Sequence, residues 1–436
     1  MKLFLFITIF LFSAFCLAQE KWTFDQVIDE VLEKDFGVKI SRIDAEIAKN
    51  NNNPGAAGYL PTINAFADQN FSISSARQEF LSGQVNEAEN AQNRSFDMGV
   101  ELNWTFFDGF KMFATDKKLN HLEDFSQMSL LAEMEMKIYE ASVAFYTLLA
   151  LQRMDSVYNE AIDLSKSRLD YIQVQIDNGA ASKAQLAQAT LDLISDSAAY
   201  IDNQRAVSEV STTLNALLAR ESNDIIRLSG ELDPEVTKVT WEELIQSAKE
   251  QNTSILQSKS MIAISSMEEK EAKSRFYPQL SFYSSYNFGS SVNEVGFLSS
   301  NRSFGPSFGI TAQWSILDQL SRVTETKNAK LNKESAEIAA KQEELTVEKS
   351  LYDAFNAYEF VTKKINFENR NAKQTEEIVS ITEKAYEAGS INPFELREIQ
   401  YGVIEAKGRL IQAQLEYLTS KMNISLLTGD FKDLLN

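Results

Sequence analysis

Apolar and polar residues alternate strictly in two stretches of the chain, which predicts β-strands. In the clearer stretch, apolar side chains at every second position from Phe96 to Phe106 are separated by polar or small residues. A period of two places successive side chains on opposite faces of a sheet. A less regular alternating segment precedes each stretch, so we expect two pairs of strands. The four expected strands cover residues of about 60–75, 95–107, 277–289 and 303–317.

After each strand pair the apolar period changes from two to between three and four, which indicates helices. Neither glycine nor proline occurs from Phe110 to Asp177 or from Leu320 to Glu387. At about 1.5 Å per residue, each of these helices would be on the order of 100 Å long. Apolar residues at coiled-coil spacing follow on the chain's return, so each long helix is expected to form an antiparallel hairpin with a second one. The expected helices cover about 110–177, 181–219, 320–387 and 393–428.

The chain is an internal duplication. Trp104 and Asp108 in the first half correspond to Trp314 and Asp318 in the second, an offset of about 210 positions that later pairs keep. Such a sustained offset marks two copies of one structural unit. Similarly, Tyr59-Leu60-Pro61 corresponds to Tyr277-Pro278-Gln279. We therefore expect a first repeat at 19–220, a connector at 221–238 and a second repeat at 239–436, in a mainly α fold with β-strands.

The first residues predict export from the cytoplasm. Lys2 is followed by an apolar run that ends in the small residue Ala18, which is typical of a secretory signal peptide at 1–18. The single cysteine, Cys16, falls inside this segment, so the exported protein would have no disulfide. Lipidation of Cys16 is an alternative that the bulky Phe15 before it disfavours.

Composition excludes several classes of function. The net charge of −20 argues against a nucleic-acid partner, because phosphate neutralisation needs clustered lysine and arginine. The single histidine, His121, makes histidine-based catalysis or a multi-histidine metal site implausible. We find no nucleophile elbow, phosphate-binding loop or metal-ligand cluster in the sequence. No catalytic residue, cofactor or metal is therefore predicted, and we do not expect an enzyme.

The four strands imply either a membrane barrel shared between chains or a soluble sheet with one wet face. No run of about 18 to 20 apolar residues follows the signal segment, so membrane entry would have to use strands. Four strands are too few to close, and free strand edges in lipid are costly, so several chains must complete one barrel. Two chains would make a filled barrel and three a barrel wide enough for passage. Trp104, Phe106 and Trp314 would form its aromatic girdle.

Together, the duplication, the strand pairs and the turns Gln175 to Gly179 and Tyr386 to Gly389 resemble the TolC family of outer-membrane efflux proteins. The resemblance covers essentially the whole mature chain. It implies a homotrimer with a twelve-stranded transmembrane β-barrel in outer-membrane lipid and a helical α-barrel that crosses the periplasm. It also implies partners, namely a periplasmic adaptor with an inner-membrane pump or ABC transporter, for either efflux or type I secretion. A non-conducting structural or adhesive coiled-coil protein is the alternative.

The resemblance also assigns candidate site residues. It implies that Tyr386, Glu395 and Glu398 close the periplasmic gate, where six carboxylates of a trimer would attract cations. Ile391 occupies the position at which some members carry a gate-locking arginine, and Arg397 is near but not aligned. The alternative for the glutamates is a solvated pair that the helix dipole favours. The turns would bind the adaptor through Asn178, Gly179, Gly389 and Ser390, although glycine also simply ends helices.

Overall fold

The computed structural model describes residues 21–233, 236–295 and 298–431, so the predicted signal peptide at 1–18 lies outside the described residues. The chain divides into two compact units. One unit comprises 1–40, 131–252 and 346–436, and the other comprises 41–130 and 253–345. Two helices of 67 residues each, α4 (Lys111–Asp177) and α8 (Ser321–Glu387), contribute to both units.

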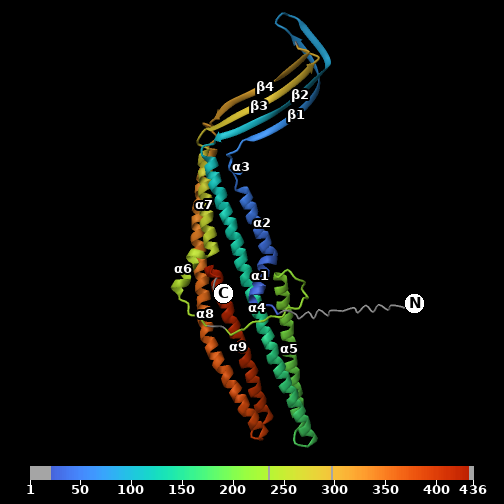
Figure 1. Ribbon diagram of the computed structural model, residues 1–436, viewed down its shortest axis with the longest axis vertical. Helices are drawn as coiled ribbons and strands as arrows, with labels where there is room; N and C mark the ends of the chain where they lie inside the picture. Colours follow the sequence, from blue (N-terminus) through green and yellow to red (C-terminus); the bar gives the residue numbers. More distant parts are fainter. Residues whose placement is uncertain (1–20, 234–235, 296–297, 432–436) are drawn as a thin grey trace, which may run out of the picture. The chain divides into compact units, whose positions relative to one another are not determined.

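A four-stranded antiparallel sheet in the second unit has the strand order β1-β2-β3-β4 (Figure 1). Consecutive strands are neighbours, so the two strand pairs of the duplication join through β2 and β3. The strands β1 and β4 form the two edges. The strands are β1 (Thr62–Glu79), β2 (Val85–Phe107), β3 (Gln279–Asn293) and β4 (Ser300–Gln313).

The first strand pair is longer than the sequence predicted. We expected strands at about 60–75 and 95–107 with a polar loop between them, whereas pairing continues to Glu79 and Val85 and passes a bulge beside Ser75. The prediction required apolar residues on one face, but this extension is polar on both faces. This extension is therefore defined by backbone hydrogen bonds and not by an apolar face. At its turn, the Phe80 N–H donates to the Gln84 carbonyl over 2.9 Å.

The second pair is also longer than predicted at the loop end, where β3 (Gln279–Asn293) passes the expected end at about 289, but it is shorter at the helix end. We expected the last strand to span about 303–317, but β4 begins at Ser300 and ends at Gln313. Beyond Gln313, the Arg322 guanidinium donates hydrogen bonds of 2.6 Å and 2.5 Å to the carbonyls of Ser315 and Ile316. Because these bonds occupy the backbone acceptors that a strand ladder would use, the alternating side chains here do not extend the strand.

The helices begin and end at residues with specific local conformations. Phe110 and Leu320 have positive φ values of 71° and 65°, so α4 and α8 each begin one residue later than predicted. The return helix α5 occupies 183–217, within the expected 181–219, and α9 has the expected bounds. The remaining helices are α1 (Phe24–Lys34), α2 (Phe36–Asn51), α3 (Pro54–Ala57), α5 (Lys183–Leu217), α6 (Trp241–Gln251), α7 (Thr253–Ser274) and α9 (Pro393–Thr428).

Both repeats use the same corner between strand and long helix. The Trp104 indole donates to the Tyr59 carbonyl over 2.9 Å, and the Trp314 indole donates to the Phe276 carbonyl over 3.1 Å. Asp108 accepts from the Met112 N–H and Asp318 from the Arg322 N–H, which satisfies free donors at each helix start. Tyr59 therefore corresponds to Phe276, rather than to Tyr277 as the sequence comparison suggested.

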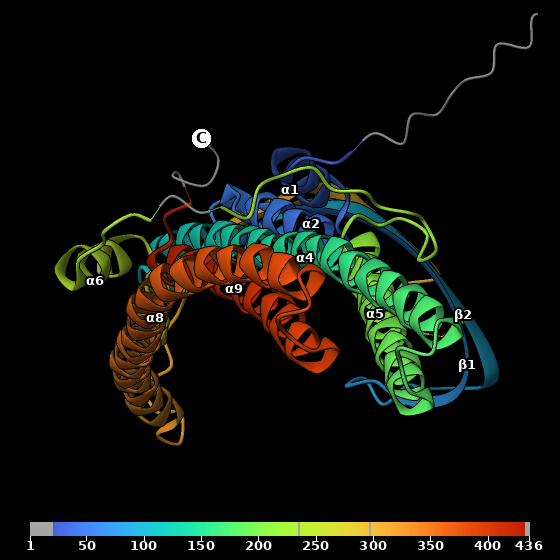
Figure 2. The ribbon, with the colours of Figure 1, turned by 90° about the horizontal axis from the view of Figure 1, so that it is seen from below.

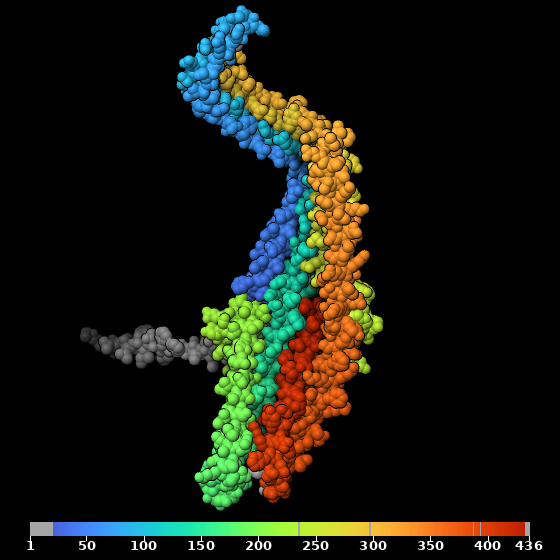
Figure 3. All heavy atoms as spheres, turned by 180° about the vertical axis from the view of Figure 1, so that it is seen from behind, coloured from blue at the N-terminus to red at the C-terminus, as the bar shows by residue number. Residues whose placement is uncertain are grey.

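In the first unit, two helical hairpins lie side by side. Figures 2 and 3 show α9 between α4 and α8, with α5 on the far side of α4. Lys407 of α9 pairs with Glu160 of α4 at 2.8 Å, and Lys364 of α8 pairs with Glu416 of α9 at 2.7 Å. The core of this unit also contains Ile226, Leu228 and Leu232 from the predicted connector, so that segment is packed as well as linking the repeats.

A buried pair of tyrosines fastens the end of the connector to α8 and α9. The hydroxyls of Tyr358 and Tyr417 lie 2.8 Å apart, and Tyr358 donates to the Thr237 carbonyl over 2.7 Å. Burial, reinforced by the hydrogen bond with Tyr417, raises the pKa of Tyr358 to about 12. The neutral phenol is therefore the form that the folded state stabilises.

This pKa predicts an alkaline loss of stability. Unfolded tyrosine ionises near pH 10, so the stabilisation is complete below pH 10 and is lost as the pH rises to about 12. In a Tyr358→Phe variant, we expect the free energy of unfolding to fall less steeply across this window. Chemical denaturation at several pH values would measure the difference, with exposed Tyr401→Phe as the control. Identical pH profiles for Tyr358→Phe and the unmodified chain would refute this role.

Candidate functional site

The strand register places apolar side chains of all four strands on one face of the sheet. Trp104 pairs with Phe282, and Phe282 pairs with Ile310, so one row crosses three strands. A second row runs from Ala67 through Met98 and Phe288. The large side chains on this face include strongly exposed ones, since Phe304, Phe308 and Ile310 are 70–75% exposed. Such a continuous exposed apolar surface is expected only where lipid or another chain covers it.

The opposite face of the sheet is polar or small at nearly every position. Asn103 pairs with Tyr283 and Gly309 follows, while Glu101 pairs with Ser285 and Ser307 follows. The face therefore presents hydroxyls, amides and carboxylates rather than apolar groups. Apart from the polar extension of β1 and β2, a sheet with one apolar and one polar face fits a barrel wall with lipid outside and water inside.

The three aromatic residues of the predicted girdle lie at the ends of β2 and β4 that lead into the long helices. The Trp104 and Phe106 rings contact each other with centroids 6.1 Å apart. Trp104, Phe106 and Trp314 are 38–59% exposed. Both indole N–H groups are hydrogen-bonded to backbone, so the rings are held with their apolar surfaces open. A membrane-interface position is consistent with this combination of an apolar body and a satisfied polar atom.

The tips of the two helical hairpins have the same construction. The Gly179 N–H donates to Ile176 and the Ala180 N–H to Gln175, and the bonds at Gly389 and Ser390 repeat this pattern. Both glycines have φ near 75°, which is a left-handed conformation. The Asn178 side chain caps the first tip by donating to the Val174 carbonyl over 3.0 Å. All four predicted docking residues, Asn178, Gly179, Gly389 and Ser390, are exposed at these tips.

Glu395 and Glu398 are exposed on the first turns of α9. The Glu395 carboxylate accepts from the Asn392 N–H over 3.0 Å, while the Asn392 side chain accepts from Glu395. This is a capping box, so one role of Glu395 is local. In the first repeat, Ser182 and Gln185 form the same box without a charge. The negative charge of Glu395 is therefore unnecessary for capping and is available for another role.

Tyr386 links the two hairpins near their tips. Its ring meets the ring of Tyr171 on α4 edge-on, with centroids 5.6 Å apart. Burial raises the pKa of Tyr386, and the nearby Tyr171 adds to the rise while the Arg168 guanidinium opposes it. Tyr386 is thus neutral at physiological pH and lies close to a cationic side chain of the other hairpin.

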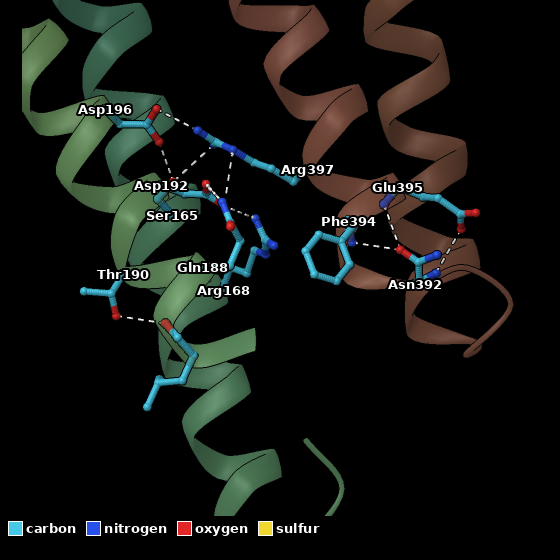
Figure 4. A network of polar contacts seen from close by, with 11 residues as sticks. Ser165, Arg168, Gln188, Thr190, Asp192, Asp196, Asn392, Phe394, Glu395 and Arg397 are labelled. Atoms are coloured by element: carbon cyan, nitrogen blue, oxygen red, sulfur yellow. Dashed lines mark hydrogen bonds and ion pairs between the residues drawn. The ribbon is translucent and has the colours of Figure 1, made fainter. Parts of the chain in front are cut away.

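A network of charges joins α9 to α4 and α5 (Figure 4). It includes Arg168, the cation that acts on Tyr386. Arg397 donates to Asp196 over 2.7 Å and to Ser165 over 3.2 Å. Ser165 in turn donates to the second oxygen of Asp196 over 2.5 Å. Arg168 donates to Asp192 over 2.7 Å, and the Arg397 Nε lies 3.8 Å from the same carboxylate. Two arginines therefore balance two aspartates in a largely buried site.

The sequence comparison missed this network. Its residues break the duplication, because Asp192 and Asp196 correspond to Gly402 and Ala406, and Arg397 corresponds to Ala187. The sequence did contain one signal for this network. At these positions, charged residues in one repeat stand where the other repeat has small residues. Ile391, at the position where some members of the family that the sequence resembles carry an arginine, has no charge, whereas Arg397, six residues further along the chain, pairs with Asp196.

Among the described residues, no helix combines the length and apolarity needed to cross a membrane. The solved structures most informative for comparison have the same fold at low identity. A membrane protein of Pseudomonas aeruginosa is 18% identical with a TM-score of 0.77, covering 93% of both chains. The CmeC outer membrane channel of Campylobacter jejuni is 17% identical with a TM-score of 0.79, over 93% of this chain and 85% of that one.

The open state of the MtrE outer membrane channel of Neisseria gonorrhoeae is 18% identical with a TM-score of 0.74, over 93% of this chain and 88% of that one. Comparison with curated protein sequences gives no match. The profile of the family described as outer membrane efflux protein matches residues 27–220 and 244–430, one segment for each repeat. The fold is therefore that of outer-membrane channels. The chain belongs to the outer membrane efflux protein family, whose members are channel proteins rather than enzymes.

Proposed function

We propose that this protein is the outer-membrane exit duct of a tripartite efflux or type I secretion system. The observation that carries the proposal is the strand register, which gives the sheet one continuous apolar face and one polar face. A lipid-facing exterior and a water-facing interior account for both. The family match supports efflux as the general role.

Three copies complete the barrel in this proposal. The outer edges of β1 and β4 carry unpaired backbone groups, which lipid cannot satisfy. Pairing β4 of one copy with β1 of the next satisfies both edges and repeats until the ring closes. These strands have 18 and 14 residues, which exceeds the roughly 9 to 11 that cross a bilayer. Three copies give twelve strands, and the helical hairpins continue the passage into the periplasm.

Closure of the duct depends on the contacts between the two hairpins of each copy. The Arg397 network and the Tyr386–Tyr171 contact hold α8 and α9 against α4 and α5 near their tips. We infer that this is the resting arrangement and that opening requires the second hairpin to leave the first. The exposed tips at Gly179 and Gly389 would receive the periplasmic adaptor, which in turn joins an inner-membrane pump or ABC transporter.

Conduction and its block by cations test this function. The full chain in a planar bilayer is expected to form discrete ion-conducting channels that divalent cations block from the periplasmic side. A Glu395→Gln, Glu398→Gln variant should lose most of the block, because six carboxylates per trimer disappear while glutamine keeps the capping box. Gln185→Glu is the matched control, since it adds a charge at the equivalent capping position of the other hairpin. Absence of any channel would contradict the function, and unchanged block would remove the glutamates from the gate.

A further inference from the structure

An aromatic pocket with lysines at its rim lies where the sheet meets the long helices. It is lined by Gly109 and Phe110 just before α4, by the first turns of α4 up to Lys117, and by residues between Met267 and Tyr277 of α7 and the corner after it. The rings of Phe110 and Tyr277 meet edge-on at 5.9 Å, and Phe110 also contacts Phe113 at 6.3 Å. These three rings are 51–57% exposed, so their apolar surfaces are uncovered in the single chain.

The pocket continues the apolar face of the sheet. A bulge near the end of β2 brings Phe107 opposite Leu280, which is on the apolar face. The Phe107 ring contacts the Phe110 ring edge-on, with centroids 5.2 Å apart. Aromatic contacts therefore connect the sheet to the pocket. Gly109 permits this corner, because a Cβ there would lie 2.3 Å from the Ser274 carbonyl oxygen. In the proposed membrane orientation, the pocket opens at the level of the inner leaflet's polar groups.

The lysines make the pocket complementary to an anion. Lys117 lies about one turn beyond Phe113 on α4, and Lys270 and Lys273 reach the rim from α7. Lys273 is paired with Glu269, but within the described residues Lys117 and Lys270 have no carboxylate within 4.0 Å. The neighbouring Glu271 is already occupied by Lys118 and Thr115. The Lys270 ammonium lies 3.8 Å from the Met267 sulfur, so among the described residues two lysines without an ion pair lie beside exposed aromatic rings.

We propose that this pocket binds an anionic glycerophospholipid, with its phosphate at Lys117 and Lys270 and an acyl chain against Phe110, Phe113 and Tyr277. The inference rests on the proposed membrane position of the sheet. A free phosphate would use the lysines but leave the rings uncovered, and a zwitterionic lipid would bring its own cation beside the two lysines. Only an anionic amphiphile satisfies both halves of the pocket.

Native mass spectrometry of the full chain in detergent would test the site. We expect phosphatidylglycerol to bind more tightly than phosphatidylcholine with the same acyl chains. A Lys117→Gln, Lys270→Gln variant should weaken phosphatidylglycerol binding by about tenfold or more and weaken phosphatidylcholine binding less, because phosphatidylcholine has no net negative charge. Phe113→Ala should weaken both lipids. The control Lys341→Gln, Lys373→Gln removes two exposed lysines from α8 and should change neither.

Equal phosphatidylglycerol affinity in the Lys117→Gln, Lys270→Gln variant and the unmodified chain would overturn the site. Displacement of the lipid by excess inorganic phosphate would also overturn it, because the lysines would then bind any phosphate. A Lys117→Arg, Lys270→Arg variant should keep the preference, because arginine retains both charges. Unchanged channel conductance of the glutamine variant would show that it has folded. Channel conductance measured on the same samples tests the proposed function separately, since the pocket lies outside the polar face that would conduct.

Discussion

Replacing Phe308 by lysine is expected to remove the assembled protein from the outer membrane. Phe308 is 72% exposed near the middle of β4, on the apolar face. A lysine near the bilayer midplane costs about 2–4 kcal/mol in each chain, and every chain of the oligomer would carry one. Quantifying the heat-modifiable oligomer in outer-membrane fractions would measure the loss.

Ser307→Lys is the matched control for this variant. Ser307 is the adjacent residue of the same strand and is on the polar face, where a lysine would remain in water. We expect it to assemble normally and to alter the ion selectivity of the channel. If both lysine variants assembled equally well, the apolar face would not be in contact with lipid.

Replacing Arg397 by alanine is expected to open the closed duct. The change leaves Asp196 with Ser165 as its partner. Asp192 and Asp196, one helical turn apart, then have only Arg168 to balance their charges. Truncating one partner of a buried charge pair costs about 3–5 kcal/mol, and the partial exposure of Arg397 places this case at the lower end. The contacts of Arg397 exist only while the hairpins are together, so the substitution destabilises the closed state alone. The population of the open state therefore rises. Single-channel recordings should show a larger mean conductance.

Arg409→Ala is the control for Arg397→Ala. Arg409 is on the same helix, and within the described residues it pairs with Glu368 and Glu405. Its own side chain is 47% exposed, so these pairs are expected to contribute about 1 kcal/mol or less. Its conductance should match that of the unmodified channel. An Arg397→Ala channel that stayed closed would show that this network does not hold the gate.

The sequence predicted the strand pairs and long helices because each depends on local periodicity. Alternation from Phe96 to Phe106 identified the apolar face before any pairing was known. The extension of β1 and β2 to Glu79 and Val85 was missed because its pairing comes from backbone groups between polar residues. Likewise, the end of β4 at Gln313 depends on where Arg322 points, which alternation does not encode.

The candidate gate was predictable only in part. The family resemblance named Tyr386, Glu395 and Glu398 as gate candidates, whereas the capping role of Glu395 follows from its geometry with Asn392. Arg397 was noticed without a partner, because Asp196 is about 200 positions away and on the other repeat. Pairing between such distant residues depends on how the hairpins pack, and one sequence with local patterns does not contain that information.

The mass of the purified protein tests the central claim most directly. The account requires that four strands per chain join those of other chains into one ring, since neither edge strand can remain unpaired in lipid. Light scattering of the detergent-extracted full chain should give three protein chains per particle, in a state that aggregates when detergent is removed. A stable single chain in detergent-free buffer would contradict the shared barrel, and with it the proposed duct.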